Sequence, residues 1–272
     1  MPPGKKPVAR APLLRRALGG LAAAVAAFGL LVCWLFGPWS PDAAERPALI
    51  VALGFPNLGL ASYEGLATGL APESTQGEVL WRAANLAATD LDDRQHAIEL
   101  LRRLVAEHPA HPRVPEALDM LGTLYERAMD DPLRAGESWA AAAQAAPDAP
   151  EAGPRWLRAG EAYTRARQPE HAEAALKAAT GFTGVAVDAW LALGDLRIKP
   201  DPAGALVAYQ AALSAGAKGR RASLAHLGVA TALERQDKKD EALQELQGTV
   251  AVGDGDDAIR QRIKLLQESD AQ

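Results

Sequence analysis

Residues 153–180 read GPRWLRAGEAYTRARQPEHAEAALKAAT, and this stretch decides the fold. Trp156, Gly160 and Tyr163 stand in the first helix of a helix–turn–helix unit, and Ala172 and Leu176 stand in the second. Glycine inside a helix costs about 1 kcal/mol relative to alanine, so Gly160 requires a packing reason. We expect the missing side chain to let the second helix press against the first.

The same pattern returns about every 34 residues between residues 78 and 250. A glycine recurs at the eighth position of the unit, and an alanine at the twentieth position is expected to make the same close approach from the other side. In the copy that begins near Glu78, we align Trp81, Asn85 and Ala88 with the signature. The signature residues are Trp81, Gly122, Tyr125, Trp156, Gly160, Tyr163, Ala172, Trp190, Gly194 and Gly228.

This spacing resembles the tetratricopeptide repeat (TPR) family, in which a Trp-x2-Leu-Gly-x2-Tyr segment precedes an Ala-x3-Phe segment. The resemblance implies an all-α fold, a right-handed α-solenoid of about five helix–turn–helix repeats over residues 78–252. Residues 253–272 are expected to hold a capping helix and tail, with Ile259, Ile263 and Leu266 on the apolar side of that helix. The alternative is an ordinary helical bundle rich in alanine and leucine.

The amino-terminal region predicts a membrane anchor. Residues 1–16 form a basic tail, and residues 17–37 carry no charge and are long enough to span a bilayer. The positive-inside rule then leaves the tail in the cytoplasm and everything after Gly37 on the far side. We weighed a cleaved signal peptide, a lipoprotein signal ending at Cys33 and a twin-arginine signal at Arg15 and Arg16, and favour an uncleaved single-pass anchor.

The only cysteine, Cys33, lies inside this apolar segment, so no intramolecular disulfide can form. The alanine-rich, arginine-rich composition together with the anchor favours a bacterial inner (plasma) membrane, with the repeat domain in the periplasm. Stated without reference to a bacterium, we expect the repeat domain to be extracytoplasmic.

Residues 38–77 are interpreted as a linker and possible N-terminal cap. Glycines at 54, 59, 65 and 69 are expected to break regular structure there, and residues 72–77 are interpreted as a linker. The alternative for the apolar part of this segment is a short motif that binds a partner or lies on the membrane surface.

The charge balance argues against nucleic acid as a partner. Five of the 29 basic residues lie in residues 1–41, so 24 basic residues face 34 acidic ones in the remainder. Such an acidic surface repels phosphate. No phosphate loop, nucleophile elbow or zinc-type spacing occurs in the sequence, so we expect no cofactor, no metal and no enzyme activity. His108 and His111 are interpreted as surface residues of a turn between repeats.

The TPR resemblance implies a partner groove lined by the first helix of each repeat. At the positions where one subgroup of the family clamps a carboxylate, this chain retains only the cations Arg82 and Arg158. The other groove positions are largely acidic, which predicts a basic or amphipathic partner segment. The acidic groove candidates are Glu116, Asp119, Glu126, Glu161, Asp188 and Asp195.

A short tail, one span and an extracytoplasmic repeat domain together resemble the ancillary subunit of the bacterial translocon and the scaffolds of envelope assembly. The expected function is therefore a membrane-anchored adaptor that mediates protein–protein interaction in a bacterial envelope complex. Two alternatives remain open. One is a translocon-associated periplasmic chaperone, and the other is a structural subunit of a secretion or motility apparatus.

Overall fold

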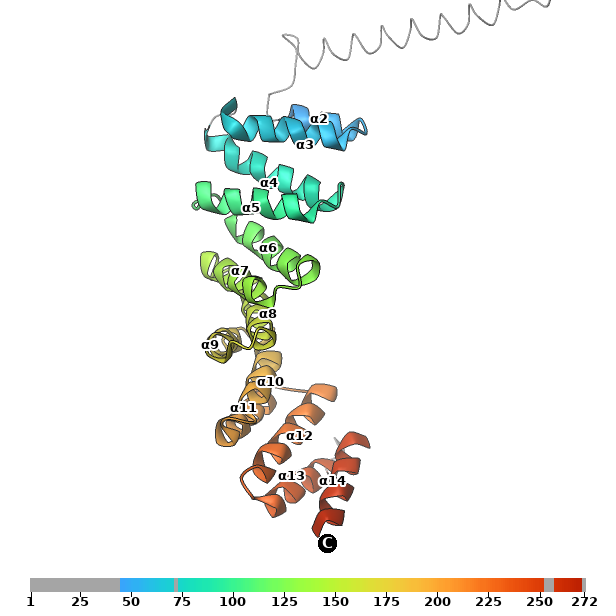
Figure 1. Ribbon diagram of the computed structural model, residues 1–272. Helices are drawn as coiled ribbons and strands as arrows, with labels where there is room; N and C mark the ends of the chain where they lie inside the picture. Colours follow the sequence, from blue (N-terminus) through green and yellow to red (C-terminus); the bar gives the residue numbers. More distant parts are fainter. Residues whose placement is uncertain (1–44, 71–72, 252–256, 271–272) are drawn as a thin grey trace, which may run out of the picture. The chain divides into compact units, whose positions relative to one another are not determined.

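The computed structural model describes residues 45–70, 73–251 and 257–270, and every regular element in these ranges is a helix (Figure 1). The described residues divide into one unit that ends at Leu86 and a second that begins at Ala87. The expected anchor at residues 17–37 lies outside the described residues. Among the helices that are described, none is both long enough and apolar enough to cross a bilayer.

The first unit is a helical hairpin followed by a longer helix. It contains α2 (Arg46–Ala52), α3 (Pro56–Gly65), the wide turn η1 (Leu66–Leu70) and α4 (Glu73–Thr89) as far as Leu86. Gly54 and Gly69 have φ values of +90° and +109°, so they turn the chain as the sequence indicates. Gly59 instead lies inside α3, where a Cβ would come within 3.1 Å of the Pro47 carbonyl oxygen.

Two expectations for residues 38–77 need correction. Gly59 does not interrupt a helix, because α3 runs through it and the missing side chain there allows α2 to approach, whereas Gly65 is the last residue of α3 and is followed directly by η1. Residues 73–77 are not a linker, because α4 already begins at Glu73.

The second unit is a stack of ten helices from α5 to α14, and each packs against the next along the chain. The helices from α6 to α13 form four pairs, each the first and second helix of one repeat, with α5 before the first pair and α14 after the last (Figure 1). Their bounds are α5 Arg94–Glu107, α6 Val114–Ala128, α7 Pro132–Ala145, α8 Ala152–Arg165, α9 Pro169–Thr180, α10 Ala186–Arg197, α11 Pro202–Ser214, α12 Arg220–Glu234, α13 Lys239–Ala251 and α14 Asp257–Asp270.

Glycines at the eighth position of the repeat allow close approaches between helices. A Cβ on Gly122 would lie 2.6 Å from the Trp139 indole, and one on Gly160 would lie 2.5 Å from Leu176. Gly194 approaches the Tyr209 ring in the same way, so in all three repeats the glycine admits the second helix of its own pair.

Gly228 departs from this arrangement. A Cβ there would also meet the Tyr209 ring, at 2.5 Å, and Tyr209 belongs to the second helix of the preceding repeat. Tyr209 is therefore held between Gly194 of α10 and Gly228 of α12. In the last repeat the glycine at the eighth position thus serves the contact between repeats, since its ring partner comes from the repeat before it.

The first copy follows a frame one residue earlier than the alignment with Trp81. Leu80, Ala84 and Ala87 are fully buried, whereas Trp81, Asn85 and Ala88 are only partly buried. Since the fully buried positions are those that carry the repeat packing, the signature of α4 falls on Leu80 and Ala84. The sequence places Trp81 at the fourth position because tryptophan is the commoner residue there, but the burial pattern assigns that position to Leu80, one residue earlier.

Aspartates begin several of the second helices. Asp93, Asp131 and Asp201 accept hydrogen bonds from the backbone N–H groups of His96, Arg134 and Gly204, which stabilises each helix start. In four of the turns that precede second helices, one residue adopts a positive φ and ends the first helix. These residues are Asp92, Asp130, Arg167 and Asp237.

The helix at the carboxyl end packs on the last repeat through the residues that the sequence indicates. Ile259 and Leu266 of α14 are buried with Leu246, and Ile263 packs against the same cluster. Arg262 donates three hydrogen bonds to the Glu234 carboxylate of α12, two from Nη2 at 2.8 and 2.9 Å and one from Nε at 3.2 Å. A terminal helix with a polar outer face is what a solenoid requires at its end.

Candidate partner-binding surfaces

The first helices of successive repeats are joined by ion pairs along one face, which we call the ladder face. In its first step, Arg158 of α8 donates a hydrogen bond to Asp119 of α6 at 3.2 Å. Arg155, whose side chain is only 6% exposed, places its Nε 3.7 Å from the same carboxylate. Asp119 therefore compensates two cations and leaves no free carboxylate for a partner.

Two further steps of the ladder face have the same form. Arg165 of α8 forms an ion pair with Glu126 of α6. Arg221 of α12 donates two hydrogen bonds to Asp188 of α10, at 2.6 and 2.8 Å. Three of the six acidic groove candidates are thus paired with arginines of the next repeat.

The remaining acidic candidates have different surroundings. Glu116 lies 3.9 Å from Arg113 of its own helix start. Asp195 accepts a hydrogen bond from the Tyr209 hydroxyl at 2.6 Å, and the pKa of that hydroxyl is raised by burial and by Asp195. The Asp195 carboxylate therefore helps to fix the ring between Gly194 and Gly228, so it has a packing role.

Glu161 of α8 is the acidic candidate that forms no ion pair within the part of the chain that the structure describes. The residue is exposed, yet its carboxyl is partly withdrawn from water between neighbouring helices, and this desolvation raises its pKa. Arg165 opposes the increase, while Glu126 and Asp188 add to it. Glu161 is consequently the ladder-face carboxylate most open to an added cation.

The two clamp cations are already engaged. Arg82 pairs with Glu78 of its own helix at 2.9 Å and hydrogen-bonds the buried Tyr63. Arg158 pairs with Asp119, and its guanidinium lies 5.9 Å from the centre of the Trp139 ring. Since both cations already have acidic and aromatic partners, they make a poor clamp for a terminal carboxylate.

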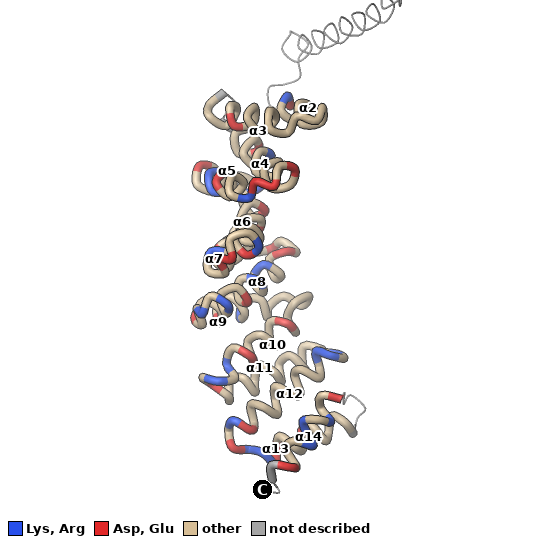
Figure 2. Tube along the Cα trace, turned by 45° about the vertical axis from the view of Figure 1, so that its right-hand side comes forward, with Lys and Arg blue, Asp and Glu red and all other residues tan. Residues whose placement is uncertain are grey.

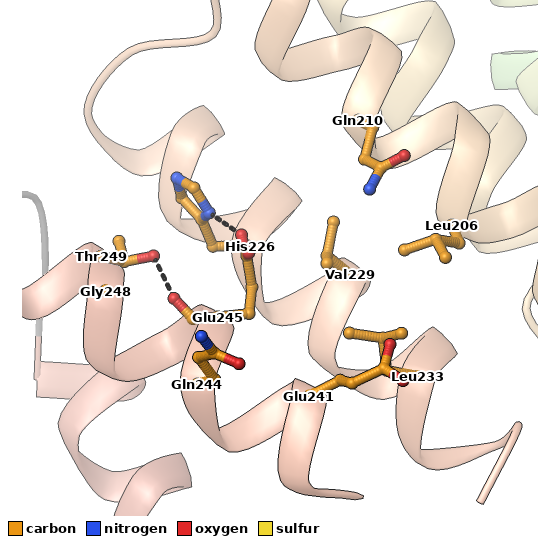
Figure 3. Close-up of a pocket in the computed structure, with 10 residues that line it drawn as sticks. All are labelled: Leu206, Gln210, His226, Val229, Leu233, Glu241, Gln244, Glu245, Gly248 and Thr249. Atoms are coloured by element: carbon orange, nitrogen blue, oxygen red, sulfur yellow. Dashed lines mark hydrogen bonds and ion pairs between the residues drawn. The ribbon is translucent and has the colours of Figure 1, made fainter. Parts of the chain in front are cut away.

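A cleft of about 620 Å³ opens between the second helices α11 and α13 (Figure 3). We call it the α11–α13 cleft. Its floor is formed by the buried side chains of Val229 and Leu233 from α12, with Leu206 of α11 beside them. The lining residues are Leu206, Gln210, His226, Val229, Leu233, Glu241, Gln244, Glu245, Gly248 and Thr249.

The rim of the α11–α13 cleft is polar and acidic. Glu241 and Glu245 stand one turn apart on α13, and His226 Nδ1 lies 2.8 Å from a Glu245 carboxylate oxygen. The Thr249 hydroxyl donates to the Glu245 backbone carbonyl at 2.9 Å, and Figure 3 shows both interactions. Gln210 and Gln244 contribute amide groups that both donate and accept hydrogen bonds. An apolar floor beside carboxylates and amides can hold a peptide segment.

A smaller cleft of about 270 Å³ occupies the corresponding place between α5 and α7, over α6. Its rim carries Arg102, Arg134 and Glu137, and the Arg134 guanidinium lies 5.8 Å from the centre of the Tyr125 ring. The two clefts share one geometry and differ in charge. The α11–α13 cleft is therefore distinguished by its acidic rim.

Sequence reasoning missed the α11–α13 cleft because it looked for a site on the first helices. The available signal was a pair of glutamates at i and i+4 on the last second helix, Glu241 and Glu245, opposite an apolar side chain such as Leu206. Two glutamates one turn apart are common on any exposed helix face. They line a cleft here only because the second helices α11 and α13 stand apart, and the sequence does not show that separation.

No group of His, Cys, Asp and Glu in the described ranges has the geometry of a metal site. His111 of the His108–His111 turn accepts a hydrogen bond from the Arg113 backbone N–H at 3.2 Å. This contact uses the His111 Nδ1 atom within the turn itself.

The sequence matches no known protein-family profile and no curated protein. Solved structures with a similar fold include the Naa15/Naa10 complex bound to HypK-THB, with a TM-score of 0.60, 15% identity and coverage of 83% of this chain and 33% of that one. The C-terminal part of a TPR repeat-containing protein from Cytophaga hutchinsonii gives 0.56 at 14% identity, with 88% and 93% covered.

A third similar structure is YrrB, described as a TPR protein with an unusual peptide-binding site. Its TM-score is 0.50 at 15% identity, and the match covers 68% of this chain and 90% of YrrB. Identities this low speak for the fold alone. The repeat spacing, the glycine contacts and these structures agree, and the chain has the α-solenoid fold of tetratricopeptide-repeat proteins.

Proposed function

We propose that this protein is a membrane-anchored TPR adaptor that holds a protein partner in a bacterial envelope complex. The observation that carries the proposal is the α11–α13 cleft, which joins an apolar floor to an acidic rim. Peptide recognition by an α-solenoid needs these two elements, an apolar anchor site and groups that orient the backbone and charges.

The chemistry of the cleft selects the partner. Leu206, with the buried Val229 and Leu233 beside it, offers an apolar contact for one aliphatic or aromatic side chain, and Glu241 and Glu245 attract a lysine or arginine next to it. The partner is therefore a segment in which an apolar residue adjoins a basic one. This keeps the basic or amphipathic partner that the sequence suggests and moves its docking place from the ladder face to the cleft.

The ladder face is the second candidate surface. Asp119, Glu126 and Asp188 already pair with arginines of the next repeat. A basic partner there would compete with these arginines and would gain an unpaired carboxylate only at Glu161. The rim carboxylates of the cleft also have basic neighbours, because Glu245 faces His226 and Glu241 lies 3.9 Å from the exposed Lys238, but neither of these pairs joins one repeat to the next. The ladder face, where a partner would have to displace arginines that join two repeats, thus supports a weaker contribution than the cleft.

The anchor and the location rest on the sequence. The uncharged segment at residues 17–37 and the basic residues before it support a single-pass protein of the inner membrane, with the solenoid on the periplasmic side. An adaptor of this kind requires no cofactor and no catalytic group. A translocon-associated chaperone would use the same cleft for many apolar segments with little selectivity.

Peptide selection tests the proposal directly. A phage library of random dodecapeptides is panned on the full chain in lipid nanodiscs, at low and at high salt. We expect enriched peptides in which Leu, Ile or Phe adjoins Lys or Arg, with affinity that falls as salt rises.

Matched variants locate the binding site. Glu241→Gln with Glu245→Gln replaces the two rim carboxylates with uncharged amides of nearly the same shape. Glu161→Gln removes the carboxylate of the ladder face that forms no ion pair. The selected peptides should bind several-fold more weakly to the cleft variant and about as well to the ladder-face variant. Equal binding to wild type and cleft variant, or enrichment of acidic peptides, contradicts the proposal.

A further inference from the structure

An exposed apolar tip lies between α2 and α3. Leu53, Phe55 and Leu58 are 47%, 58% and 59% exposed, and they fall within six consecutive residues. We call these three residues the hairpin tip. Large apolar side chains exposed together indicate a surface that contacts something other than water.

The hairpin tip is held in a defined shape. Gly54 has a φ of +90° and ends α2, and Pro56 opens α3 at its first position. The opposite side of the hairpin is buried, with Pro47, Gly59 and Tyr63 in its interior. The hairpin therefore buries one apolar side in its interior and leaves a second apolar surface, the hairpin tip, exposed.

No charged residue occurs from Pro47 to Tyr63, a stretch that holds the tip and most of both arms, and the charged Arg46 and Glu64 stand at the ends of the arms away from the tip. Figure 2 shows this as a tube without acidic or basic colour through the turn that joins α2 to α3. A protein partner would normally be met by some charged or hydrogen-bonding side chains at the edge of the contact. An apolar surface without charge is suited instead to the acyl and headgroup boundary of a bilayer.

The distance from the proposed anchor supports the same occupant. Eight residues separate Gly37 from Arg46, and an extended chain of that length spans at most about 29 Å. The hairpin tip is thus tethered near the bilayer surface, and the tether raises its effective concentration there. This step rests on the anchor of the proposed function.

We propose that the hairpin tip inserts into the membrane surface on the far side of the bilayer, as a second lipid contact after the anchor. Leu53, Phe55 and Leu58 enter the boundary region, and α2 and α3 lie against the headgroups. The contact would fix the start of the solenoid close to the membrane.

Depth-dependent quenching tests the insertion. Asn57→Cys, in a Cys33→Ser background, carries a nitrobenzoxadiazole label in the middle of the tip, because Asn57 is exposed and its loss leaves the three apolar residues intact. The full chain is reconstituted into phosphatidylcholine–phosphatidylglycerol vesicles that contain doxyl-labelled lipid. We expect the label to lose most of its fluorescence and to shift its emission to the blue.

Two controls separate the possible failures. The same label on Val207→Cys, a 61% exposed position of α11, should remain unquenched. A label on the native Cys33 reports the anchor itself. Quenching at Cys33 without quenching at position 57 overturns the insertion and leaves the anchor intact. Absence of quenching at Cys33 overturns the anchor, and the insertion that rests on it falls as well.

A charge variant completes the test. Phe55→Glu with Leu58→Glu, combined with the label at position 57, should abolish the quenching while the Cys33 label stays quenched. Unchanged quenching at position 57 in this variant would show that the tip side chains do not cause the contact.

Discussion

Two tryptophans show how the repeat positions differ in their contribution to stability. Trp139 is 2% exposed and covers Gly122, whereas Trp156, at the fourth position of its repeat, is only partly buried. The repeat signature places a tryptophan at the fourth position of the first helix. In this chain the fully buried tryptophan instead belongs to the second helix of its pair.

We therefore expect Trp139→Ala to lower the free energy of unfolding by about 3–5 kcal/mol, the range for a large buried side chain. Trp156→Ala, the matched control, should cost clearly less because part of its ring already faces water. Urea unfolding followed by circular dichroism measures both. An equal loss in the two variants would contradict the assigned packing.

The glycines inside helices also differ in how closely they are packed, and alanine substitution distinguishes a closely packed glycine from one that faces open space. Gly122→Ala places a methyl group 2.6 Å from the Trp139 indole, which is too buried to move aside, so we expect a loss of about 1–3 kcal/mol. Gly248→Ala in α13 meets no atom within 4 Å and should gain up to about 1 kcal/mol from helix propensity. Thermal unfolding of the two variants should shift in opposite directions, and shifts of the same sign would count against the packing reason for Gly122.

Glu161 predicts a pH dependence of stability. Desolvation raises the pKa of this carboxyl in the folded chain, so folding favours its protonated form. The contribution of protonated Glu161 to the free energy of unfolding is fully present below the ordinary glutamate pKa. It is lost as pH rises through the pKa that Glu161 has in the folded chain.

Glu161→Gln should therefore melt at a higher temperature than wild type at neutral pH, and the difference should shrink at acidic pH. The exposed glutamate Glu137, changed to Gln, controls for the loss of one surface charge. A difference between Glu161→Gln and wild type that does not change with pH would refute the raised pKa.

At the scale of helices, the arginine–carboxylate pairs of the ladder face join α6 to α8 and α10 to α12. These pairs differ in burial. Asp119 compensates Arg155, whose side chain is 6% exposed, whereas Asp188 pairs with Arg221, whose side chain is 59% exposed. Removing a carboxylate is costly when a buried cation remains and nearly neutral when the cation can return to water.

We expect Asp119→Ala to cost about 2 kcal/mol or more, because it leaves the buried Arg155 without its counter-charge. Asp188→Ala should cost less than about 1 kcal/mol. Chemical unfolding of both variants, each compared with wild type, gives the two values. A larger loss at Asp188 would reverse the account of the ladder face.

Helix starts were the elements most open to prediction from sequence. Asp131-Pro132 and Asp201-Pro202 combine a capping side chain with a proline at the first helical position, and both begin helices in the structure. The frame of α4 was less accessible, because Leu80 and Trp81 are both suited to the fourth position. Only burial distinguishes them, and burial depends on which face of the helix the rest of the fold covers.

For the whole molecule, the repeated spacing predicted the fold and left the sites undetermined. The spacing reflects contacts within a repeat, such as Gly160 with Leu176, which are local in the chain. The ladder pairs join residues 33 to 39 positions apart, and the α11–α13 cleft depends on how far two second helices separate. Neither quantity follows from the spacing. The sequence therefore predicted an acidic groove, whereas in the structure three of its carboxylates are paired with arginines of the next repeat.

In-cell photo-crosslinking tests the central claim of a partner-binding adaptor most directly. The photoreactive residue benzoylphenylalanine replaces Gln244 at the α11–α13 cleft in one strain and Glu161 at the ladder face in another, within the full chain. Adducts are identified by mass spectrometry. Glu170 of α9, exposed and outside the described cleft, provides the control position.

The account predicts one or two recurrent envelope proteins crosslinked from position 244, with fewer adducts from position 161 and none from position 170. The adducts at position 244 should decrease when Glu241→Gln and Glu245→Gln are added. A broad set of secretory proteins would support the chaperone instead. The absence of adducts from both surfaces would contradict the adaptor.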